Sequence, residues 1–259
     1  MKQPLSYIHP NAKIAKNVVI EPFTSIDGDV VIGEGTCIGS NVSIMDGARI
    51  GKNCNIFPGA VISANPQDLK YNNEKTYVEI GDNVTIRECV TINKGTNDRL
   101  KTVIGNNCLI MAYSHIAHDC FVGNNVILAN NVPLGGHAHV GDYALIGGNS
   151  AVQQFTRVGK SAMIGGMGGV VRDIIPYGIA HGNRSVLQGL TLIGLRRKNI
   201  PNKEIMTLSD AYKEIFMNEN LTENLSNLSN EFKNNELVAE VIEFIDMDKK
   251  RPICTPFSK

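Results

Sequence analysis

The stretch IGNNCLIMAYSHIAHDCFVGNNVI, residues 104–127, divides into four hexads that each begin with an aliphatic residue. The same phase runs from residue 8 to residue 170, where 25 of the 28 positions taken at every sixth residue are Ile, Leu or Val. Because these three residue types make up about a quarter of the chain, chance would place only about seven of them there. A period of six fits neither a helix nor a long strand, so each hexad is predicted to be a short strand followed by a turn.

Hexapeptide repeats of this kind predict a parallel β-helix. Three hexads make one triangular coil, which places residue i beside residue i+18. A second column, two residues before each aliphatic, is mostly small or β-branched and includes Cys54, Cys108 and Cys120. The six cysteines show no CxxC pair and no metal-ligand spacing, so we expect reduced, buried thiols.

The aliphatic phase fails at Asp68, Glu74 and Asp98 and then resumes unchanged. Loops are therefore expected near 68–79 and 98–103, inserted in multiples of six residues. A loop on a rigid scaffold often carries function, which makes QDLKYNNE, residues 67–74, the first candidate, with a tolerated surface excursion as the alternative. Residues 1–184 are predicted to form the β-helix.

The hexad rule ends after Val170, and residues 185–259 are predicted to form a C-terminal α-helical domain. Apolar spacing places helices at about 185–195, 201–217, 221–232 and 237–247. This domain is expected to cover the open end of the β-helix.

Charge and targeting patterns narrow the function. Lys and Arg number 25 and Asp and Glu number 25, so the formal net charge is zero, which argues against nucleic acid as a partner. The first ten residues contain no basic segment followed by an apolar run, and no transmembrane segment is predicted. We therefore expect a cytoplasmic protein.

The coil spacing gathers polar residues on one edge. His118 stacks beside Gly136 and then Gln154, while the adjacent column contains Asp119 and His137. Histidine, with an ordinary pKa near 6.5, suits a general base, and a neighbouring carboxylate such as Asp119 can shift that pKa electrostatically. A glycine N–H can stabilise a developing oxyanion.

These columns hold no serine or cysteine nucleophile, which favours direct attack by a substrate over a covalent intermediate. Zinc held by histidines from neighbouring chains is the competing interpretation, although Gly136 and Gln154 are poor zinc ligands. Beyond the repeats, Arg196, Arg197 and Lys198 either form a solvated helix end or pair with a pyrophosphate.

Several motifs together resemble the bacterial UDP-N-acetylglucosamine O-acyltransferase family over nearly the whole chain. They are QDLKY from Gln67, HIAHDCFVGN from His115, LGGH from Leu134, GGNSAVQQF from Gly147 and GLRRK from Gly194.

This resemblance implies a left-handed parallel β-helix that forms a homotrimer with active sites between subunits. The family transfers a 3-hydroxyacyl chain from acyl carrier protein to the 3-position of UDP-N-acetylglucosamine in lipid A biosynthesis, without a cofactor or metal. On this pattern His118 is the general base and the Gly136 N–H is the oxyanion donor. The substrate-binding residues that it implies are Asp68, Lys70, His115, His137, Gln154, Arg197 and Lys198.

Two further positions follow from the resemblance. Gly166 matches the position that measures acyl length, and glycine there implies a long chain, although it also suits an ordinary turn. The family commonly has histidine where this chain has Gln153, a side chain that does not titrate near neutral pH. We therefore hypothesise altered acceptor selectivity, with N-acylation of the 3-amino analogue as the alternative reaction.

The acidic carrier protein needs a basic docking patch, for which Arg157, Lys160 and Arg172 are candidates together with the basic tail residues. Three other functions compete: N-acylation of an already 3-acylated sugar, zinc-dependent hydration and a non-enzymatic binding scaffold. Enzymes of the first kind usually carry an additional N-terminal domain, whereas the hexads here begin by Ile8. Metal analysis would expose the second. The clustered His118, Gly136 and Gln154 argue against the third.

Overall fold

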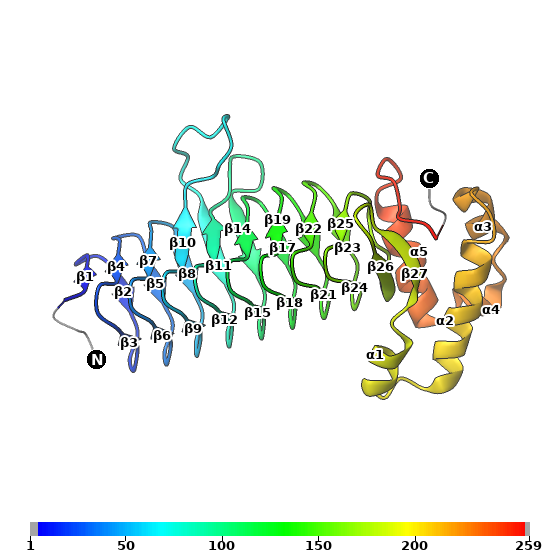
Figure 1. Cartoon of the computed structure of the whole chain (residues 1–259), viewed down its shortest axis with the longest axis horizontal. Helices are drawn as coiled ribbons and strands as arrows, with labels where there is room; N and C mark the ends of the chain where they lie inside the picture. Colours follow the sequence, from blue (N-terminus) through cyan, green and yellow to red (C-terminus); the bar gives the residue numbers. More distant parts are fainter. Residues whose placement is uncertain (1–4, 257–259) are drawn as a thin grey trace.

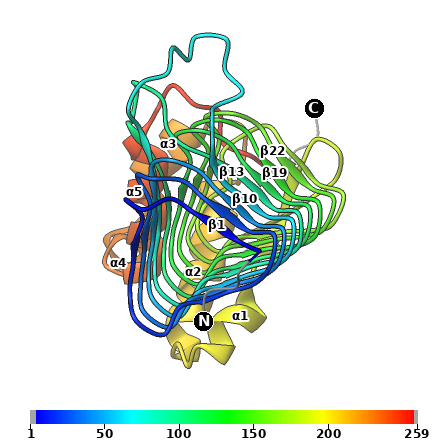
Figure 2. The same cartoon turned by 90° about the vertical axis from the view of Figure 1, so that its left-hand side faces the viewer.

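The computed structural model describes residues 5–256 and contains a three-sided β-helix with helices at its C-terminal end (Figure 1). Viewed from the N-terminal end, the coils stack in register and a loop at 65–76 projects beyond them (Figure 2). Each side of the β-helix is one sheet of short strands, and we number the sheets in chain order.

The first sheet pairs all of its strands in parallel. Its strands are β1 (Tyr7–Ile8), β4 (Ser25–Ile26), β7 (Ser43–Ile44), β10 (Val61–Ala64), β13 (Thr91–Asn93), β16 (His115–Ile116), β19 (Pro133–Leu134), β22 (Ala151–Val152) and β25 (Gly169–Val170).

The second sheet is also parallel. Its strands are β2 (Lys13–Ile14), β5 (Val31–Ile32), β8 (Ala48–Ile50), β11 (Tyr77–Ile80), β14 (Lys101–Ile104), β17 (Phe121–Val122), β20 (His139–Val140) and β23 (Arg157–Val158).

The third sheet is parallel except for its last strand, which pairs antiparallel. Its strands are β3 (Val19–Ile20), β6 (Cys37–Ile38), β9 (Asn55–Ile56), β12 (Thr85–Ile86), β15 (Leu109–Ile110), β18 (Ile127–Leu128), β21 (Leu145–Ile146), β24 (Met163–Ile164), β26 (Gly178–His181) and β27 (Val186–Leu190).

The strand register confirms the predicted coil. His115 pairs with Pro133, 18 positions later. The two interruptions lengthen this offset in steps of six: Val61 pairs with Thr91, and Tyr77 pairs with Lys101. The chain therefore leaves the coil at 65–76 and 94–100 and re-enters it without shifting the inward-facing residues.

The inward-facing aliphatic column is buried from Ile20 to Val170, and it forms the centre of the core. Most corners turn through a residue in the left-handed region, and asparagine supplies many of these, including Asn53, Asn107 and Asn125. Asparagine tolerates a positive φ better than other non-glycine residues, which explains the repeated GNN and GKN turns.

The C-terminal helices are α1 (Leu192–Arg197), α2 (Asn202–Ile215), α3 (Leu221–Asn227), α4 (Asn230–Lys233) and α5 (Glu236–Met247). The helices expected at 201–217 and 237–247 are confirmed as α2 and α5. Lys160 Nζ donates to Glu240 Oε1 at 2.6 Å and the Tyr177 hydroxyl donates to Glu240 Oε2, which fastens α5 to the last coils. Within residues 5–256, no helix has the length and apolarity needed to cross a membrane.

Two helix predictions are wrong in detail. The segment expected to begin a helix near Ser185 is instead β27, whose antiparallel pairing includes Gly189 at φ +126, outside the helical region. The helix expected at 221–232 is divided, because the Ser229 side chain accepts from Phe232 N and begins α4. The strand β27, formed in place of the first expected helix, gives β26 at the end of the third sheet a hydrogen-bonded partner.

The cysteine prediction is partly wrong. Cys54, Cys108, Cys120 and Cys254 are buried, but Cys37 and Cys89 are exposed. Burial raises the pKa of Cys120 to about 12, which makes its thiolate rare at neutral pH.

Candidate active site

The two histidines predicted to gather on one edge do lie together, at the corner between the first and second sheets. His118 follows β16 and His137 follows β19, and their rings meet edge to face with centroids 5.1 Å apart. The Phe155 ring stacks on His137 at 4.4 Å. The column of coils thus holds both imidazoles in fixed orientations.

Asp119 fixes the orientation of the His118 ring. His118 Nδ1 lies 2.8 Å from Asp119 Oδ2, and the Asp119 carboxylate is completely buried. Since a carboxylate only accepts, His118 donates through Nδ1, and its Nε2 carries the free lone pair. An imidazole held in one orientation by a buried carboxylate has the geometry that a general base can use.

Gly136 lies directly against the His118 ring. A Cβ at Gly136 would stand 2.7 Å from both Cε1 and Nε2 of His118. The Gly136 N–H donates to no acceptor within residues 5–256, so it is available to a ligand. The predicted stacking of His118 beside Gly136 is therefore confirmed as geometry.

The inserted loops form the other wall. Asp68 Oδ2, on the loop at 65–76, lies 3.8 Å from His118 Nε2. Lys70 is exposed on the same loop, and its N–H donates to Asp68 Oδ1 at 2.9 Å. Both residues line a cavity of about 480 Å³ together with His137 and Phe155.

Burial sets the charge of the surrounding groups. It lowers the pKa of His137, and it also lowers the pKa of His115, to which the neighbouring His118 contributes. Both imidazoles therefore favour their neutral form. Burial alone would raise the pKa of Asp119, but hydrogen bonds from Thr96 and His118 outweigh it and hold the pKa below its ordinary value.

His115 and the two glutamines are placed less directly. The His115 ring lies 2.7 Å, through Nδ1, from Thr91 Oγ1 on the outer face of the first sheet. Gln153 and Gln154 are exposed one coil beyond Gly136, and their side chains have no hydrogen-bond partner within the described residues. The backbone of Gln154 lies against Gly135, the residue before Gly136.

Metal binding is geometrically conceivable at one place in residues 5–256. Donor atoms of His118, Asp119 and His137 all lie within 4.8 Å of one another. The shared carboxylate, however, already accepts from His118 and from the Thr96 hydroxyl, at 2.8 and 2.6 Å. Because both hydrogen bonds fall on the same oxygen of Asp119, the cluster fits a carboxylate that orients a histidine better than a set of metal ligands.

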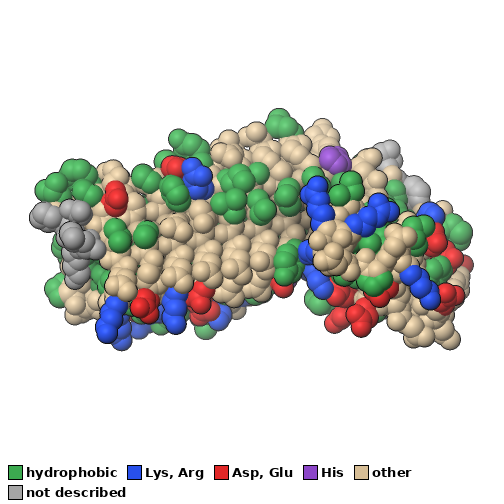
Figure 3. Space-filling view, turned by 90° about the horizontal axis from the view of Figure 1, so that it is seen from below, with side chains coloured by type: hydrophobic (Ala, Val, Ile, Leu, Met, Phe, Trp, Pro, Cys, Tyr) green, Lys and Arg blue, Asp and Glu red, His purple; other side chains and the backbone are tan. Residues whose placement is uncertain are grey.

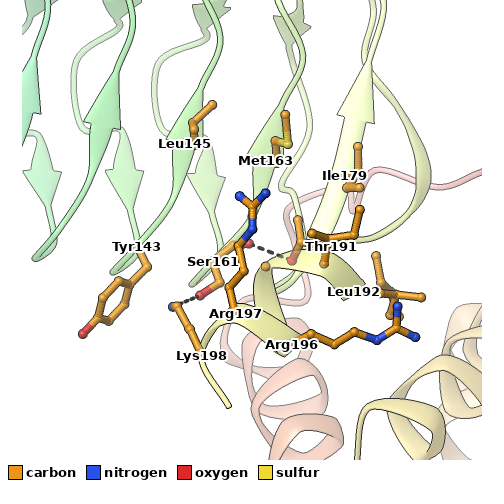
Figure 4. Close-up of a pocket in the computed structure, with 14 residues that line it drawn as sticks. Tyr143, Leu145, Ser161, Met163, Ile179, Thr191, Leu192, Arg196, Arg197 and Lys198 are labelled. Carbon is orange, nitrogen blue, oxygen red and sulfur yellow. Dashed lines mark hydrogen bonds between the residues drawn. The ribbon is translucent and has the colours of Figure 1, made fainter. Parts of the chain in front are cut away.

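A second cavity, of about 650 Å³, lies beside α1 (Figure 4). Leu145 and Met163 of the third sheet form part of its apolar floor, and Arg197 and Lys198 supply basic groups. Lys198 Nζ donates to Ser161 Oγ at 2.8 Å. Burial lowers the pKa of Lys198, and the positive charge of Lys160 lowers it further. From below, hydrophobic side chains follow the β-helix, and Lys and Arg gather where the helices begin (Figure 3).

Not all predicted site residues meet in one chain. His118 lies at the corner between the first and second sheets, whereas the cavity with Arg197 and Lys198 lies on the third sheet. Gly166 is exposed at the corner between the third and first sheets, after β24.

Sequence reasoning missed Thr96, whose N–H and hydroxyl both bind Asp119. It also missed the apolar floor formed by Leu145 and Met163. The break in the repeat at Asp98 was the available signal for the first, because it marked an inserted loop without identifying its contacts.

Family models match three parts of the chain. They are the Udp N-acetylglucosamine O-acyltransferase domain 2 at residues 173–254, the bacterial transferase hexapeptide repeat at 101–136 and the GMPPB C-terminal domain at 2–103. The acyl-[acyl-carrier-protein]–UDP-N-acetylglucosamine O-acyltransferase of Bartonella henselae is 41% identical over 255 residues, covering 98% of this chain and 93% of its own length. The chain belongs to the UDP-N-acetylglucosamine O-acyltransferase family.

Other members of the family match over nearly the full length of this chain. The enzyme of the same name from Chlamydia caviae is 42% identical over 251 residues, covering 96% of this chain and 90% of its own. The UDP-N-acetylglucosamine acyltransferase structure from Bacteroides fragilis has a TM-score of 0.94 at 42% identity, covering 98% of this chain and 99% of that chain. The fold predicted from the resemblance, a left-handed parallel β-helix with C-terminal helices, is confirmed.

Proposed function

We propose that this acyltransferase moves a 3-hydroxyacyl chain from acyl carrier protein to the 3-hydroxyl of UDP-N-acetylglucosamine, with His118 as general base. The observation that carries the proposal is the His118–Asp119 pair at 2.8 Å, which leaves Nε2 free beside Gly136 and Asp68. This gives the transfer of the acyl group a base without a protein nucleophile.

The reaction proceeds by direct attack. His118 Nε2 takes the proton of the sugar hydroxyl as its oxygen bonds to the thioester carbonyl carbon. The resulting oxyanion accepts from the Gly136 N–H. The carbon–sulfur bond then breaks, and the departing thiolate of the carrier takes the proton back from His118. Asp119 stabilises the imidazolium between the two proton transfers.

Substrate recognition is divided between the two cavities. Asp68 and Lys70 hold the sugar nucleotide near the base, with His115, His137 and Gln154 around it. The cavity beside α1 has an apolar floor that suits an acyl chain, and Arg197, supported by Lys198 at its edge, contacts the nucleotide phosphates.

A homotrimer would bring these parts together. In one chain the base and the α1 cavity lie on different sides of the β-helix. Threefold assembly allows the base corner of one subunit to face the α1 cavity of the next, which completes the site between subunits.

The docking patch for the carrier protein is smaller than the sequence predicts, because two of its basic residues are paired within the chain. Arg157 Nε donates to Asp173 Oδ2 at 2.6 Å, and its guanidinium packs under Phe244, so this residue does not offer its charge to a partner. Lys160 is paired with Glu240. Arg172 and the basic end of α1 remain the candidates for acidic carrier protein.

The acceptor atom is decided by competition. The enzyme is given a 3-hydroxyacyl carrier protein with equal amounts of UDP-N-acetylglucosamine and its 3-amino analogue, and mass spectrometry identifies the products. An ester supports the proposed hydroxyl acceptor. An amide product supports the second candidate, N-acylation. Gln153 favours this reaction because its side-chain oxygen can accept a hydrogen bond from the amine of the sugar while the lone pair of the amine nitrogen attacks. Formation of neither product would contradict acyl transfer.

Gln153→His tests that selectivity. Gln153 is exposed on the coil after Gly136, so the substitution changes the site with little change to the core. We expect the ratio of amide to ester to fall several-fold, measured in the same competition. An unchanged ratio would remove Gln153 as a selectivity residue.

Gly166→Met tests the control of chain length. Among residues 5–256, a Cβ at Gly166 would contact only the Gly148 carbonyl oxygen, at 3.3 Å, so a larger side chain can extend outward from this corner. We expect the preferred donor to become shorter, measured with a series of acyl carrier proteins of different chain length. Retained turnover of the short donors is the internal control, and an unchanged preference would refute this role.

A further inference from the structure

The loop at 94–100 does more than interrupt the repeat, because it encloses the Asp119 carboxylate. The Thr96 N–H donates to Oδ1 at 3.0 Å and the Arg99 N–H donates to the same oxygen at 3.2 Å. The Thr96 hydroxyl donates to Oδ2 at 2.6 Å. Three donors from one loop thus fix both oxygens of a carboxylate on the β16–β17 connection, which is the same corner one coil further along.

The direction of the hydroxyl follows from its two partners. The Asp98 N–H donates to Thr96 Oγ1 at 3.3 Å, so this oxygen serves as an acceptor on one side. On the other side it faces a carboxylate oxygen, which can only accept. The hydroxyl hydrogen therefore points at Asp119 Oδ2.

Oδ2 is also the oxygen that accepts from His118 Nδ1, at 2.8 Å. The hydroxyl of Thr96 and the imidazole of His118 consequently meet on one atom. A carboxylate free to rotate could leave either donor, but one held by three loop donors keeps Oδ2 in front of Nδ1. This fixes the tautomer with Nε2 unprotonated, as well as the angle of the ring.

We infer that Thr96 is a positioning residue for the base, acting through Asp119 rather than on the substrate. The inference rests on the proposed function of His118. It predicts that removing the Thr96 hydroxyl impairs the chemical step while leaving the binding of the sugar nucleotide in place.

The kinetic test compares Thr96→Val, Thr96→Ser and the wild type. Thr96→Val removes the hydroxyl but keeps the shape, and we expect kcat to fall about tenfold or more with KM for the sugar nucleotide changed less than about twofold. Thr96→Ser restores the hydroxyl and is expected to recover most of kcat. If the valine variant does not fold, Thr96→Ala replaces it.

Thr36→Val is the matched control. The Thr36 hydroxyl also donates to one oxygen, Gly51 O at 3.0 Å, and accepts from one N–H, that of Cys54 at 3.1 Å, in coils remote from the base. Its loss should lower thermal stability with kcat near the wild-type value. An equal fall of kcat in both variants, or kcat of Thr96→Val within twofold of the wild type, would overturn the inference.

Imidazole spectra separate this inference from the proposed function. With histidine-selective ¹⁵N labelling, the wild type should show His118 protonated at Nδ1 and unprotonated at Nε2, and Thr96→Val should show a mixture of tautomers. This readout needs no turnover. Identical spectra of the two proteins would refute the positioning role even in an active enzyme. A wild type that makes no acyl product would refute the proposed function, and the spectra would still show whether Thr96 positions His118.

Discussion

His118→Ala is expected to lower kcat by about 10²- to 10⁴-fold, the usual contribution of a general base. The loss follows because Nε2 of His118 is the proposed base, beside Gly136, and Asp119 holds the opposite nitrogen. Steady-state assays with acyl carrier protein and UDP-N-acetylglucosamine measure it. Since only the chemical step is removed, binding of the sugar nucleotide by calorimetry should persist.

His9→Ala is the control for this substitution, because His9 also follows a strand of the first sheet, in the opening coil. It should retain wild-type kcat. Both variants should sediment as trimers, and a monomer would contradict the proposed assembly. Turnover of His118→Ala near the wild-type rate would refute the assignment of the base.

Gly136→Ala is expected to cost about 10²-fold in kcat, although it adds one methyl group. That methyl would stand 2.7 Å from two atoms of the His118 ring, well inside the normal contact distance of about 3.5 Å between carbon atoms. The ring must therefore move, and its 2.8 Å hydrogen bond to Asp119 is lost or stretched. Gly136 does not have a positive φ, so the backbone itself accepts alanine.

Gly28→Ala gives a matched comparison. A Cβ there would stand 2.9 Å from Nδ1 of His9, which is the same kind of clash between a corner methyl and an imidazole. Its effect should be confined to stability, measured by thermal unfolding. If Gly28→Ala lost as much activity, or Gly136→Ala lost none, the contact between Gly136 and the base would carry no catalytic meaning.

The coil geometry was predictable because it depends on a local rule. A hexad phase that continues through Asp68 and Asp98 requires inserted loops in multiples of six, and the pairing of Val61 with Thr91 obeys it. The neighbourhood of His118 and Gly136 follows from the same offset. The position of catalytic candidates on a solenoid is thus largely an arithmetic consequence of the sequence.

Contacts made by loops and distant segments were not predictable in this way. Nothing in the sequence around Thr96 indicates that it binds Asp119, because the conformation of the inserted loop has no period. The charge of Arg157 predicts a place in the docking patch, but its side chain pairs with Asp173 and packs on the ring of Phe244, a residue of α5. The spacing of Leu187 and Leu190 fits a helix, but pairing with β26 made this segment a strand.

The one-dimensional stacking of the coils also determines which parts of the molecule the site depends on. Each strand pairs only with its neighbours, and the residues around the base come from the loops at 65–76 and 94–100 and the coils of β16, β19 and β22. In such an array, local opening at one end spreads only through successive interfaces. The opening coils can therefore fray and exchange their amide hydrogens without disturbing the proposed base, His118, and its neighbours.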